Sequence, residues 1–314
     1  MSGRALARRL LQILIVLIGI SFLTFILTYL APGDPVRTML SASGTMPSEE
    51  VLEERREEMG LNDPVLVQYF RWLTNCLHGD FGHSYSTGRE VGELLASRLW
   101  PTVKLALLSL VLMLIVAVPL GMLSAVYRGK PIDYIVRGFT FLGVSMPNFW
   151  VGLLLLYFVC LKLGLLPVVS VGKGFKNVIL PAVTLAFAMA SKYTRQVRTA
   201  VLEELHQDYV TGARARGASE TGILWKQVFP NALLPLVTML GLSLGSLLGG
   251  TAVVEVIFSY QGLGNLAVSA ITAYDYNLIQ GYVLWVALIY MVLNLVVDLS
   301  YYWVDPRIRL NADR

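Results

Sequence analysis

The sequence has little of what an enzyme or a disulfide-bonded secreted domain needs. It contains two cysteines in 314 residues, and one of them, Cys160, lies inside an apolar run, so no disulfide framework is indicated. It contains no Gly-x-x-x-x-Gly-Lys-Ser/Thr phosphate loop, and we therefore expect no ATP binding or hydrolysis by this chain. No paired acids and no nucleophile beside a base stand out as a catalytic set. We expect a protein that is not an enzyme and has no cofactor of its own.

Charge is also scarce. Only 15% of the residues are charged, whereas 55% are hydrophobic and the mean hydropathy is +0.62. This composition is typical of a protein that crosses a membrane several times. A net charge of +4 would suggest nucleic acid as the partner of a soluble chain. Here the basic residues gather at the ends of apolar runs, where membrane topology explains them, so we expect contact with lipid and none with nucleic acid.

Six apolar runs predict membrane-spanning helices. The first, Leu10 to Leu30, would be about 30 Å long and follows three arginines, which predicts an uncleaved anchor with its N-terminus inside. The others are Pro101–Val126, Tyr134–Cys160, Val178–Tyr193, Leu234–Ile257 and Ile279–Trp303. Most of the 25 Lys and Arg residues then lie inside, with both termini.

The predicted fold class is therefore an all-α membrane protein with six transmembrane helices. We divide it into an N-terminal anchor (1–31), a periplasmic segment (32–100) and a five-helix core (101–314) that contains a polar cytoplasmic loop (195–231).

The segment 32–100 predicts three short helices. Ser48 and Gly60 are a cap and a stop for the first, Pro64 opens the second, and the third lies near Val91 to Leu99. The second helix carries two adjacent apolar stripes, Val65, Tyr69, Trp72 and Cys76 beside Leu66, Phe70, Leu73 and Leu77. Together they predict a broad apolar face that lies on the membrane surface or on a partner.

The same segment contains four residues with atoms that can bind a metal: Cys76, His78, Asp80 and His83. Imidazole with a thiolate or carboxylate would suit Ni(II) or Zn(II). The alternative is that His78 and Asp80 cap a helix and stabilise a turn, while Cys76 packs as a small apolar residue. No tight, repeated ligand spacing is present, so the sequence favours the alternative.

The polar loop 195–231 is unusually long and charged for its position between two apolar runs. Residues at helical spacing (Leu202, Leu205, Tyr209 and Ala213) give it a weakly apolar side, whereas Arg214 and Arg216 project elsewhere. Gly217 is a helix stop, and Ala213 and Ala215 are small enough for another surface to approach closely. The pattern predicts a short helix that a soluble partner grips.

This loop resembles the loop by which permease subunits of bacterial ABC importers engage their ATPases. The general pattern is kept at Ala213, Gly217 and Pro230. The peptide/nickel branch is matched at 208–210, 213–217 and 231–232, although Gln227 and Pro230 stand where that branch usually has His and Arg. Further matches cover nearly the whole chain, at 60–64, 68–69, 72–73, 79–84, 142–150, 179–181, 255–258, 262–264, 275–276, 294–298 and 305–309.

The resemblance to the oligopeptide/dipeptide/nickel permease B type implies a type I importer permease of a bacterial inner membrane. It implies a second permease subunit, two ATPase subunits that bind ATP and Mg, and an extracytoplasmic substrate-binding protein. The residues that would couple to the ATPase are Asp208, Tyr209, Ala213, Arg214, Arg216 and Gly217. The wording of 145–150 and the short stretch from Pro167 to Pro181 lean toward nickel or a metal chelate, with di- or oligopeptides as the alternative.

Within the membrane runs, Pro147 and Asn148 predict a kink with a polar group, and a ridge of glycines at 241, 245 and 249 allows two helices to approach closely. The candidate translocation residues are Pro147, Asn148, Ser243, Gly245 and Ser246; static packing is the alternative for each. Glu255 and Asp298 are acids at depth, for which we favour structural roles. A secondary transporter or channel is the competing class, but neither an inverted repeat nor an acidic relay is evident.

Overall fold

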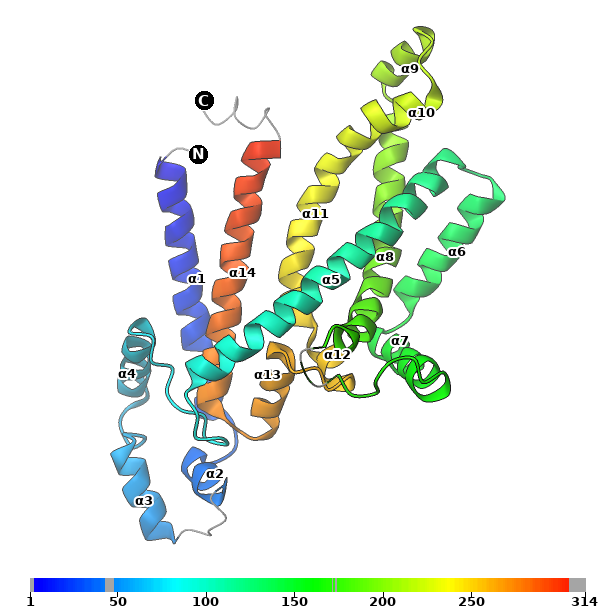
Figure 1. The fold of residues 1–314 in the computed structure, drawn as a ribbon. Helices are drawn as coiled ribbons and strands as arrows, with labels where there is room; N and C mark the ends of the chain where they lie inside the picture. The colour runs from blue at the N-terminus through cyan, green and yellow to red at the C-terminus, as the bar shows by residue number, and fades with distance from the viewer. Residues whose placement is uncertain (1–2, 43–47, 171, 173, 305–314) are drawn as a thin grey trace. The chain divides into compact units, whose positions relative to one another are not determined.

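The computed structural model describes residues 3–42, 48–170, 172 and 174–304 (Figure 1). Across these residues the regular structure is helical, apart from one isolated bridge between His83 and Glu90. The chain forms two compact units, Met1–Thr102 with Gln261–Val292, and Val103–Tyr260 with Leu293–Arg314.

The first unit combines both ends of the chain. It contains α1 (Gly3–Leu30), α2 (Pro35–Ala42), α3 (Glu49–Glu58), α4 (Val65–Leu77), α13 (Leu263–Thr272) and the first parts of α5 (Val91–Val126) and α14 (Tyr276–Val304). Its core is formed where α5, α13 and α14 meet, around Leu95, Leu263 and Leu278.

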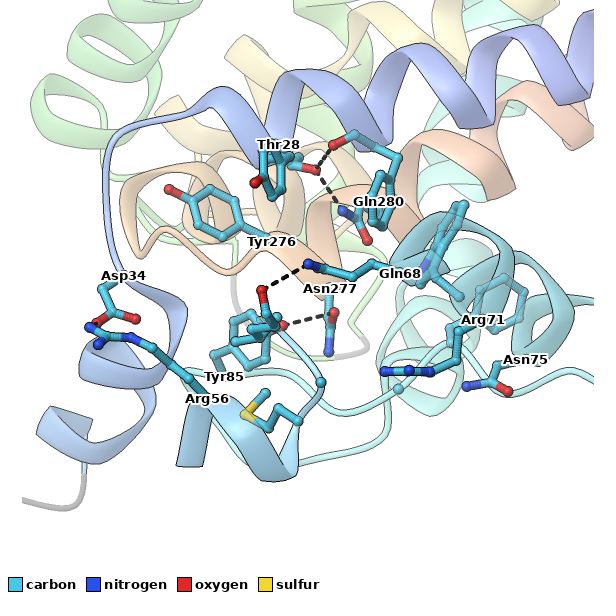
Figure 2. Close-up of a pocket in the computed structure, with 18 of the residues that line it drawn as sticks. Thr28, Asp34, Arg56, Gln68, Arg71, Asn75, Tyr85, Tyr276, Asn277 and Gln280 are labelled. Carbon is cyan, nitrogen blue, oxygen red and sulfur yellow. Dashed lines mark hydrogen bonds and ion pairs between the residues drawn. The ribbon is translucent and has the colours of Figure 1, made fainter. Parts of the chain in front are cut away.

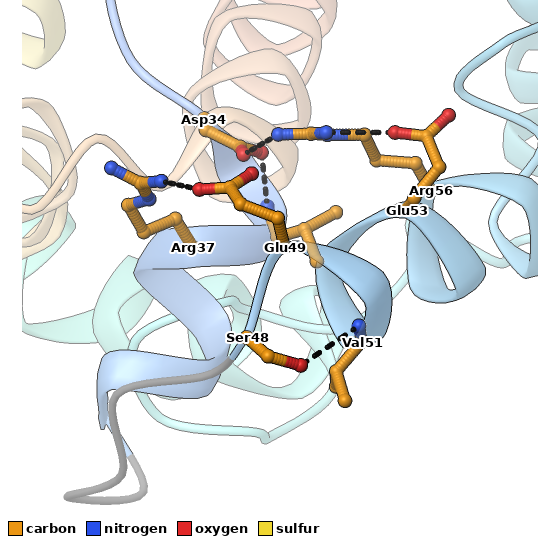
Figure 3. A network of polar contacts seen from close by, with 8 residues as sticks. Asp34, Arg37, Ser48, Glu49, Val51, Glu53 and Arg56 are labelled. Atoms are coloured by element: carbon orange, nitrogen blue, oxygen red, sulfur yellow. Dashed lines mark hydrogen bonds and ion pairs between the residues drawn. The ribbon is translucent and has the colours of Figure 1, made fainter.

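The helix cap and the helix stop predicted for the segment 32–100 are both present. The Ser48 hydroxyl accepts a hydrogen bond from the Val51 N–H (3.5 Å), and Gly60 follows α3 with a φ of +65°, so the cap and the stop are confirmed. Figure 3 shows how ion pairs tie α3 to α2 and to the end of α1: Arg37 pairs with Glu49, and Arg56 bridges Asp34 and Glu53. Burial opposes ionisation of Asp34, but hydrogen bonds from Arg56 and the Val36 N–H outweigh it and lower the pKa of this carboxyl.

The expected third short helix near Val91 is not separate. It is the first part of α5, a continuous helix of 36 residues in which Pro101 is accommodated. A helix of this length measures about 54 Å, well beyond an apolar bilayer core of about 30 Å, so α5 extends out of the membrane.

The second unit contains the remaining helices. They are α6 (Pro131–Ser145), α7 (Asn148–Leu155), the π-helical turn η1 (Leu156–Lys162), α8 (Lys176–Leu205), α9 (Asp208–Ala215), α10 (Glu220–Ile223), η2 (Leu224–Val228), α11 (Phe229–Gly250) and α12 (Ala252–Ile257). A buried cluster around Leu105, Leu185 and Phe258 forms one core, and a second cluster lies around Val201 and Val210.

Pro147 does more than kink a helix, which corrects the prediction for this run. The helices 131–145 and 148–162 meet at 102°, so the run is broken in two. Proline lacks an N–H and disfavours helical geometry in the residue before it. Accordingly Met146 and Pro147 both adopt extended backbone angles between the two helices.

Three described helices are long and apolar enough to cross a membrane, at Ala7–Leu30, Val91–Val126 and Tyr276–Val297. The broken pair 131–162 would be a fourth. Large apolar side chains such as Leu14, Leu23 and Leu27 are exposed along α1, as expected for a surface in contact with lipid.

Candidate functional site

The polar loop folds into a short helix, α9, held at the ends of α8 and α11 (Figure 1). Its C-terminus is where the sequence predicts it. Arg216 caps the helix, and Gly217 follows with a φ of +81°, a left-handed conformation that favours glycine. The Gly217 N–H donates to the Arg214 carbonyl (2.9 Å) and the Ala218 N–H to the Ala213 carbonyl (3.1 Å), which satisfies the last turn.

One side of α9 is buried in the chain itself. Val210 is fully buried and Ala213 is 1% exposed. They join a cluster with Met122 of α5 and Val197 and Val201 of α8. The expectation that Ala213 leaves room for another protein is therefore wrong, because its side chain faces this chain's own core.

The other side of α9 is polar and exposed. Asp208, Tyr209, Arg214 and Arg216 all lie on it. The Arg214 guanidinium donates two hydrogen bonds to Glu220 (2.7 and 3.1 Å), and this contact lowers the pKa of the Glu220 carboxyl. The site thus presents a charged face on a helix whose opposite side is fixed in the core.

Close to the cluster that holds α9 lies an ion pair that the sequence does not predict. Asp133 of α6 is 1% exposed and receives hydrogen bonds from the Arg198 Nε and Nη2 of α8 (2.9 and 3.0 Å). Its carboxylate also accepts from the Ser124 hydroxyl (2.6 Å) and the Gly129 N–H (3.0 Å). We call these residues the Asp133 clamp. The positive-inside pattern explains Arg198 without a partner, so the sequence gives no sign of this pair.

The candidate translocation residues lie on separate elements of the second unit. Asn148 is exposed at the first turn of α7, directly after the break at Pro147. Ser243 of α11 bonds the Tyr193 hydroxyl, which also donates to the Met239 carbonyl (2.6 Å). Gly245 is buried, whereas the side chains of Ser246 and Asp298 lie outside the described residues.

The glycine ridge packs closely at one end. A methyl group added to Gly241 would overlap the Val297 side chain of α14. Close approach at this glycine is thus a packing contact within the chain. Glu255 is fully buried on α12 and accepts a hydrogen bond from the Thr251 hydroxyl (3.0 Å), as the structural interpretation expects.

The metal-capable side chains of the segment 32–100 do not come together in the part of the chain that the structure describes. Among the described residues, no group of three or more His, Cys, Asp or Glu side chains is placed to hold a metal ion. His78 caps α4 with its ring nitrogen 2.8 Å from the Thr74 carbonyl. Asp80 accepts from the Gly82 N–H (2.8 Å) in the turn that follows. His78 and Asp80 therefore take the helix-capping and turn geometry.

The first unit contains a cavity of about 470 Å³ (Figure 2). Its walls come from the end of α1, from α3 and α4, and from the start of α14. The Gln280 amide donates to the Thr28 hydroxyl (2.6 Å), and Tyr85 donates to Asn277 (3.1 Å). The first contact ties α1 to α14, and the second ties the segment 32–100 to α14.

Asp275 joins the segment 32–100 to the start of α14 by hydrogen bonds. It is fully buried, and its Oδ1 accepts from the Leu278 N–H at the start of α14 (3.3 Å). Its Oδ2 accepts from the Ser84 hydroxyl (2.6 Å) and from the Ser86 N–H and hydroxyl (3.1 and 2.9 Å). The sequence places Asp275 before an apolar helix, a position typical of a cap, but it gives no sign of the distant serines.

Comparison with known proteins identifies the family. Residues 117–310 match the model described as "Binding-protein-dependent transport system inner membrane component", and residues 3–106 match the model of the corresponding N-terminal region. The chain is 37% identical to the probable D,D-dipeptide transport system permease protein DdpB of Escherichia coli (strain K12), over 96% of each chain. It is 40% identical to the oligopeptide transport system permease protein AppB of Bacillus subtilis (strain 168), over 96% of this chain and 98% of that one.

A third relative is the metal-staphylopine import system permease protein CntB of Staphylococcus aureus (strain NCTC 8325 / PS 47), 37% identical over 94% of this chain and 95% of that one. Among solved structures, the inward-facing MetNI methionine ABC transporter contains a chain that superposes with a TM-score of 0.56 at 22% identity, over 68% of this chain and 96% of that one. This likeness shows a shared fold. The protein is an integral membrane permease and belongs to the inner membrane components of binding-protein-dependent ABC importers, with peptide permeases among its relatives.

Proposed function

We propose that this chain is one of two similar permease subunits of an ATP-driven importer in a bacterial inner membrane. Two ATPase subunits would bind ATP and Mg²⁺, and an extracytoplasmic binding protein would deliver the substrate. The observation that carries the proposal is the build of α9: Val210 and Ala213 fix the helix in the core, while Asp208, Arg214 and Arg216 remain exposed. A helix held in this way can transmit a displacement caused by a partner to α5 and α8, which contribute to the same buried cluster.

The proposed topology has six crossings with both termini cytoplasmic. The crossings are α1, α5, the broken α6–α7 pair, α8, α11 and α14. The first part of α8, from Val178 to Tyr193, is apolar and the rest carries it into the cytoplasm beside α9. This arrangement places the arginines of α9 inside, in agreement with the positive-inside rule.

Two single cysteines test this topology. In a background without Cys76 and Cys160, Glu57→Cys on α3 should react with an impermeant maleimide in intact spheroplasts. Arg216→Cys on α9 should react only after the membrane is opened. Both positions are exposed, so a reversed pattern would refute the topology.

Coupling residues take different roles in the proposal. Asp208, Tyr209, Arg214 and Arg216 form the face that touches the ATPase, Gly217 ends the helix, and Ala213 anchors it from within. The test is co-purification of the ATPase subunits with the permease. Reversing the charge of Arg216 should loosen that association, whereas Thr199→Ala at an exposed position of α8 should leave it unchanged. Equal retention of the ATPase by both variants would remove α9 from the contact.

The break at Pro147 supplies the polar groups of the proposed path. Met146 and Pro147 are extended, so the N–H groups of Asn148 and Phe149 have no preceding helical turn to bond, whereas those of Trp150 and Val151 donate to the Pro147 carbonyl (3.0 and 3.2 Å). Asn148 is exposed in this chain, and in a bilayer such an amide needs protein or water as its neighbour. We place the path along this break and the Ser243 side of α11.

The substrate class in this proposal is small peptides. The D,D-dipeptide and oligopeptide relatives support it. The second candidate is nickel or a metal chelate. The sequence of residues 145–150 favours it, and the metal-staphylopine relative supports it. Native mass spectrometry of the cognate binding protein separates the two: a bound peptide without metal supports the first candidate, and a bound metal or chelate supports the second.

A further inference from the structure

The helix α4 packs against α1 well before the end of that apolar helix. The Tyr69 hydroxyl is 2.9 Å from the Ser21 hydroxyl, and Ser21 lies nine residues before the end of α1 at Leu30. At 1.5 Å per residue this is about 14 Å below the end of the helix. The apolar half-thickness of a bilayer is about 15 Å, so this contact belongs to the hydrocarbon layer.

Aromatic contacts hold the two helices side by side over about one turn of each helix (Figure 1). The Tyr69 ring lies 5.2 Å from Phe22 and 5.5 Å from Phe25, measured between centroids, and Trp72 lies 5.9 Å from Phe25. Several rings in contact fix the position of α4 beside α1 more firmly than one hydrogen bond would.

The surface that α4 turns away from α1 is apolar. Leu66 is 57% exposed, Phe70 61% and Leu77 79%. Spaced at four and seven residues, they form one continuous stripe on the helix. The neighbouring helix α1 also carries exposed apolar side chains, among them Leu23 and Leu27, as expected for contact with lipid.

A third side of α4 is polar and faces the cavity. Gln68, Arg71 and Asn75 line it, as Figure 2 shows. The Gln68 amide donates to the carbonyls of Leu61 and Asp63 (2.8 Å each), and Arg71 pairs with Asp63. One helix thus has a packed side, an apolar exposed side and a polar side toward a cavity, as in helices that lie in a membrane interface.

From this geometry we infer that α4 is embedded in one leaflet of the bilayer, with Leu66, Phe70 and Leu77 in contact with acyl chains. That the leaflet is the outer one rests on the proposed topology. The outer segment is then only partly free for a binding protein: α3 and the cavity face water, whereas the exposed stripe of α4 does not.

The test uses the complete importer in lipid nanodiscs, with a nitroxide on single cysteines in a background without Cys76 and Cys160. Collision rates with oxygen, which concentrates in lipid, and with a water-soluble nickel chelate are measured at Leu66, Phe70 and Leu77. Leu27 of α1 serves as the lipid reference, Glu57 of α3 as the aqueous reference, and Asn75 as the matched control on the polar side of α4.

We expect the three stripe positions to resemble Leu27, with at least fivefold less chelate collision than at Glu57, and Asn75 to resemble Glu57. Chelate collision equal to that at Glu57 would overturn the proposal, because the stripe would lie in water. Low collision with both reagents would also overturn it, because a protein surface would then cover the stripe. Maleimide labelling of Glu57→Cys assigns the leaflet separately, so a wrong topology cannot be mistaken for a wrong depth.

Discussion

Arg198 and Asp133 form a bidentate ion pair. The Arg198 Nε lies 2.9 Å from the Asp133 Oδ1, and the Arg198 Nη2 lies 3.0 Å from the Asp133 Oδ2. The Asp133 carboxylate is almost fully buried. The pair joins α8 to the start of α6, and Ser124 adds α5. Three helices of the second unit therefore share one charged contact close to the cluster that holds α9.

Breaking this pair should destabilise the permease strongly. Asp133→Ala leaves the Arg198 guanidinium without its partner, and removing one member of a buried pair costs about 3–5 kcal/mol. We expect a lower Tm of the purified complex in detergent. The double variant Asp133→Leu with Arg198→Met should recover part of the loss, since no uncompensated charge remains. A double variant as unstable as the single one would show that the pair itself is not responsible.

Substitutions on the two sides of α9 should fail in different ways. Ala213→Trp overfills a position that is 1% exposed, at a cost of about 1–3 kcal/mol or more, and should lower the abundance of the permease. Arg216→Glu changes an exposed charge and should leave the abundance of the permease unchanged, while ATPase retention falls and uptake per permease falls at least fivefold. If Ala213→Trp keeps normal abundance and loses only uptake, the inward placement of Ala213 is wrong.

Gly217 provides a narrower test of the helix end. Its φ of +81° costs a non-glycine residue about 1–2 kcal/mol, so Gly217→Ala should loosen the end of α9. Gly212→Ala within α9 is the matched control, because Gly212 does not have a positive φ and an added methyl group would meet only the tip of the Arg216 side chain, at 3.4 Å. Hydrogen exchange of residues 213–218 should speed up in the first variant and not in the second.

The proposed path predicts a separation of transport from assembly. Asn148→Leu should lower uptake per assembled complex, since it removes an exposed amide at the start of α7. Gly241→Leu should lower abundance and uptake in proportion, because its side chain would overlap Val297. Gly245→Leu tests whether the glycine ridge belongs to the translocation path. Unchanged uptake per complex in both Asn148→Leu and Gly245→Leu would remove these helices from the path.

Much of the local structure could be predicted from single residues. Ser48, Gly60 and Gly217 fixed helix ends because a cap or a left-handed backbone depends on the residue itself. The distant contacts could not be predicted in the same way. Asp133 meets Arg198 across 65 residues, and Asp275 meets Ser84 across 191, and no periodic pattern carries such pairings.

The inward placement of Ala213 has a similar cause. A small residue on a short helix suits close approach by a partner as well as by the chain's own α5 and α8, and only packing decides between them. The 102° break at Pro147 also exceeded the prediction, because helical spacing does not show how far the chain turns between two apolar helices.

The central claim is that this permease is driven by partner ATPases that act through α9. Uptake of the substrate identified on the binding protein, measured in proteoliposomes containing the complete importer, tests it most directly. We expect uptake with ATP on the ATPase side, no uptake with an ion gradient alone, and a large loss of ATP-driven uptake with Arg216→Glu at equal permease abundance. Uptake driven by an ion gradient without ATP, or full ATP-driven uptake by the Arg216→Glu complex, would contradict it.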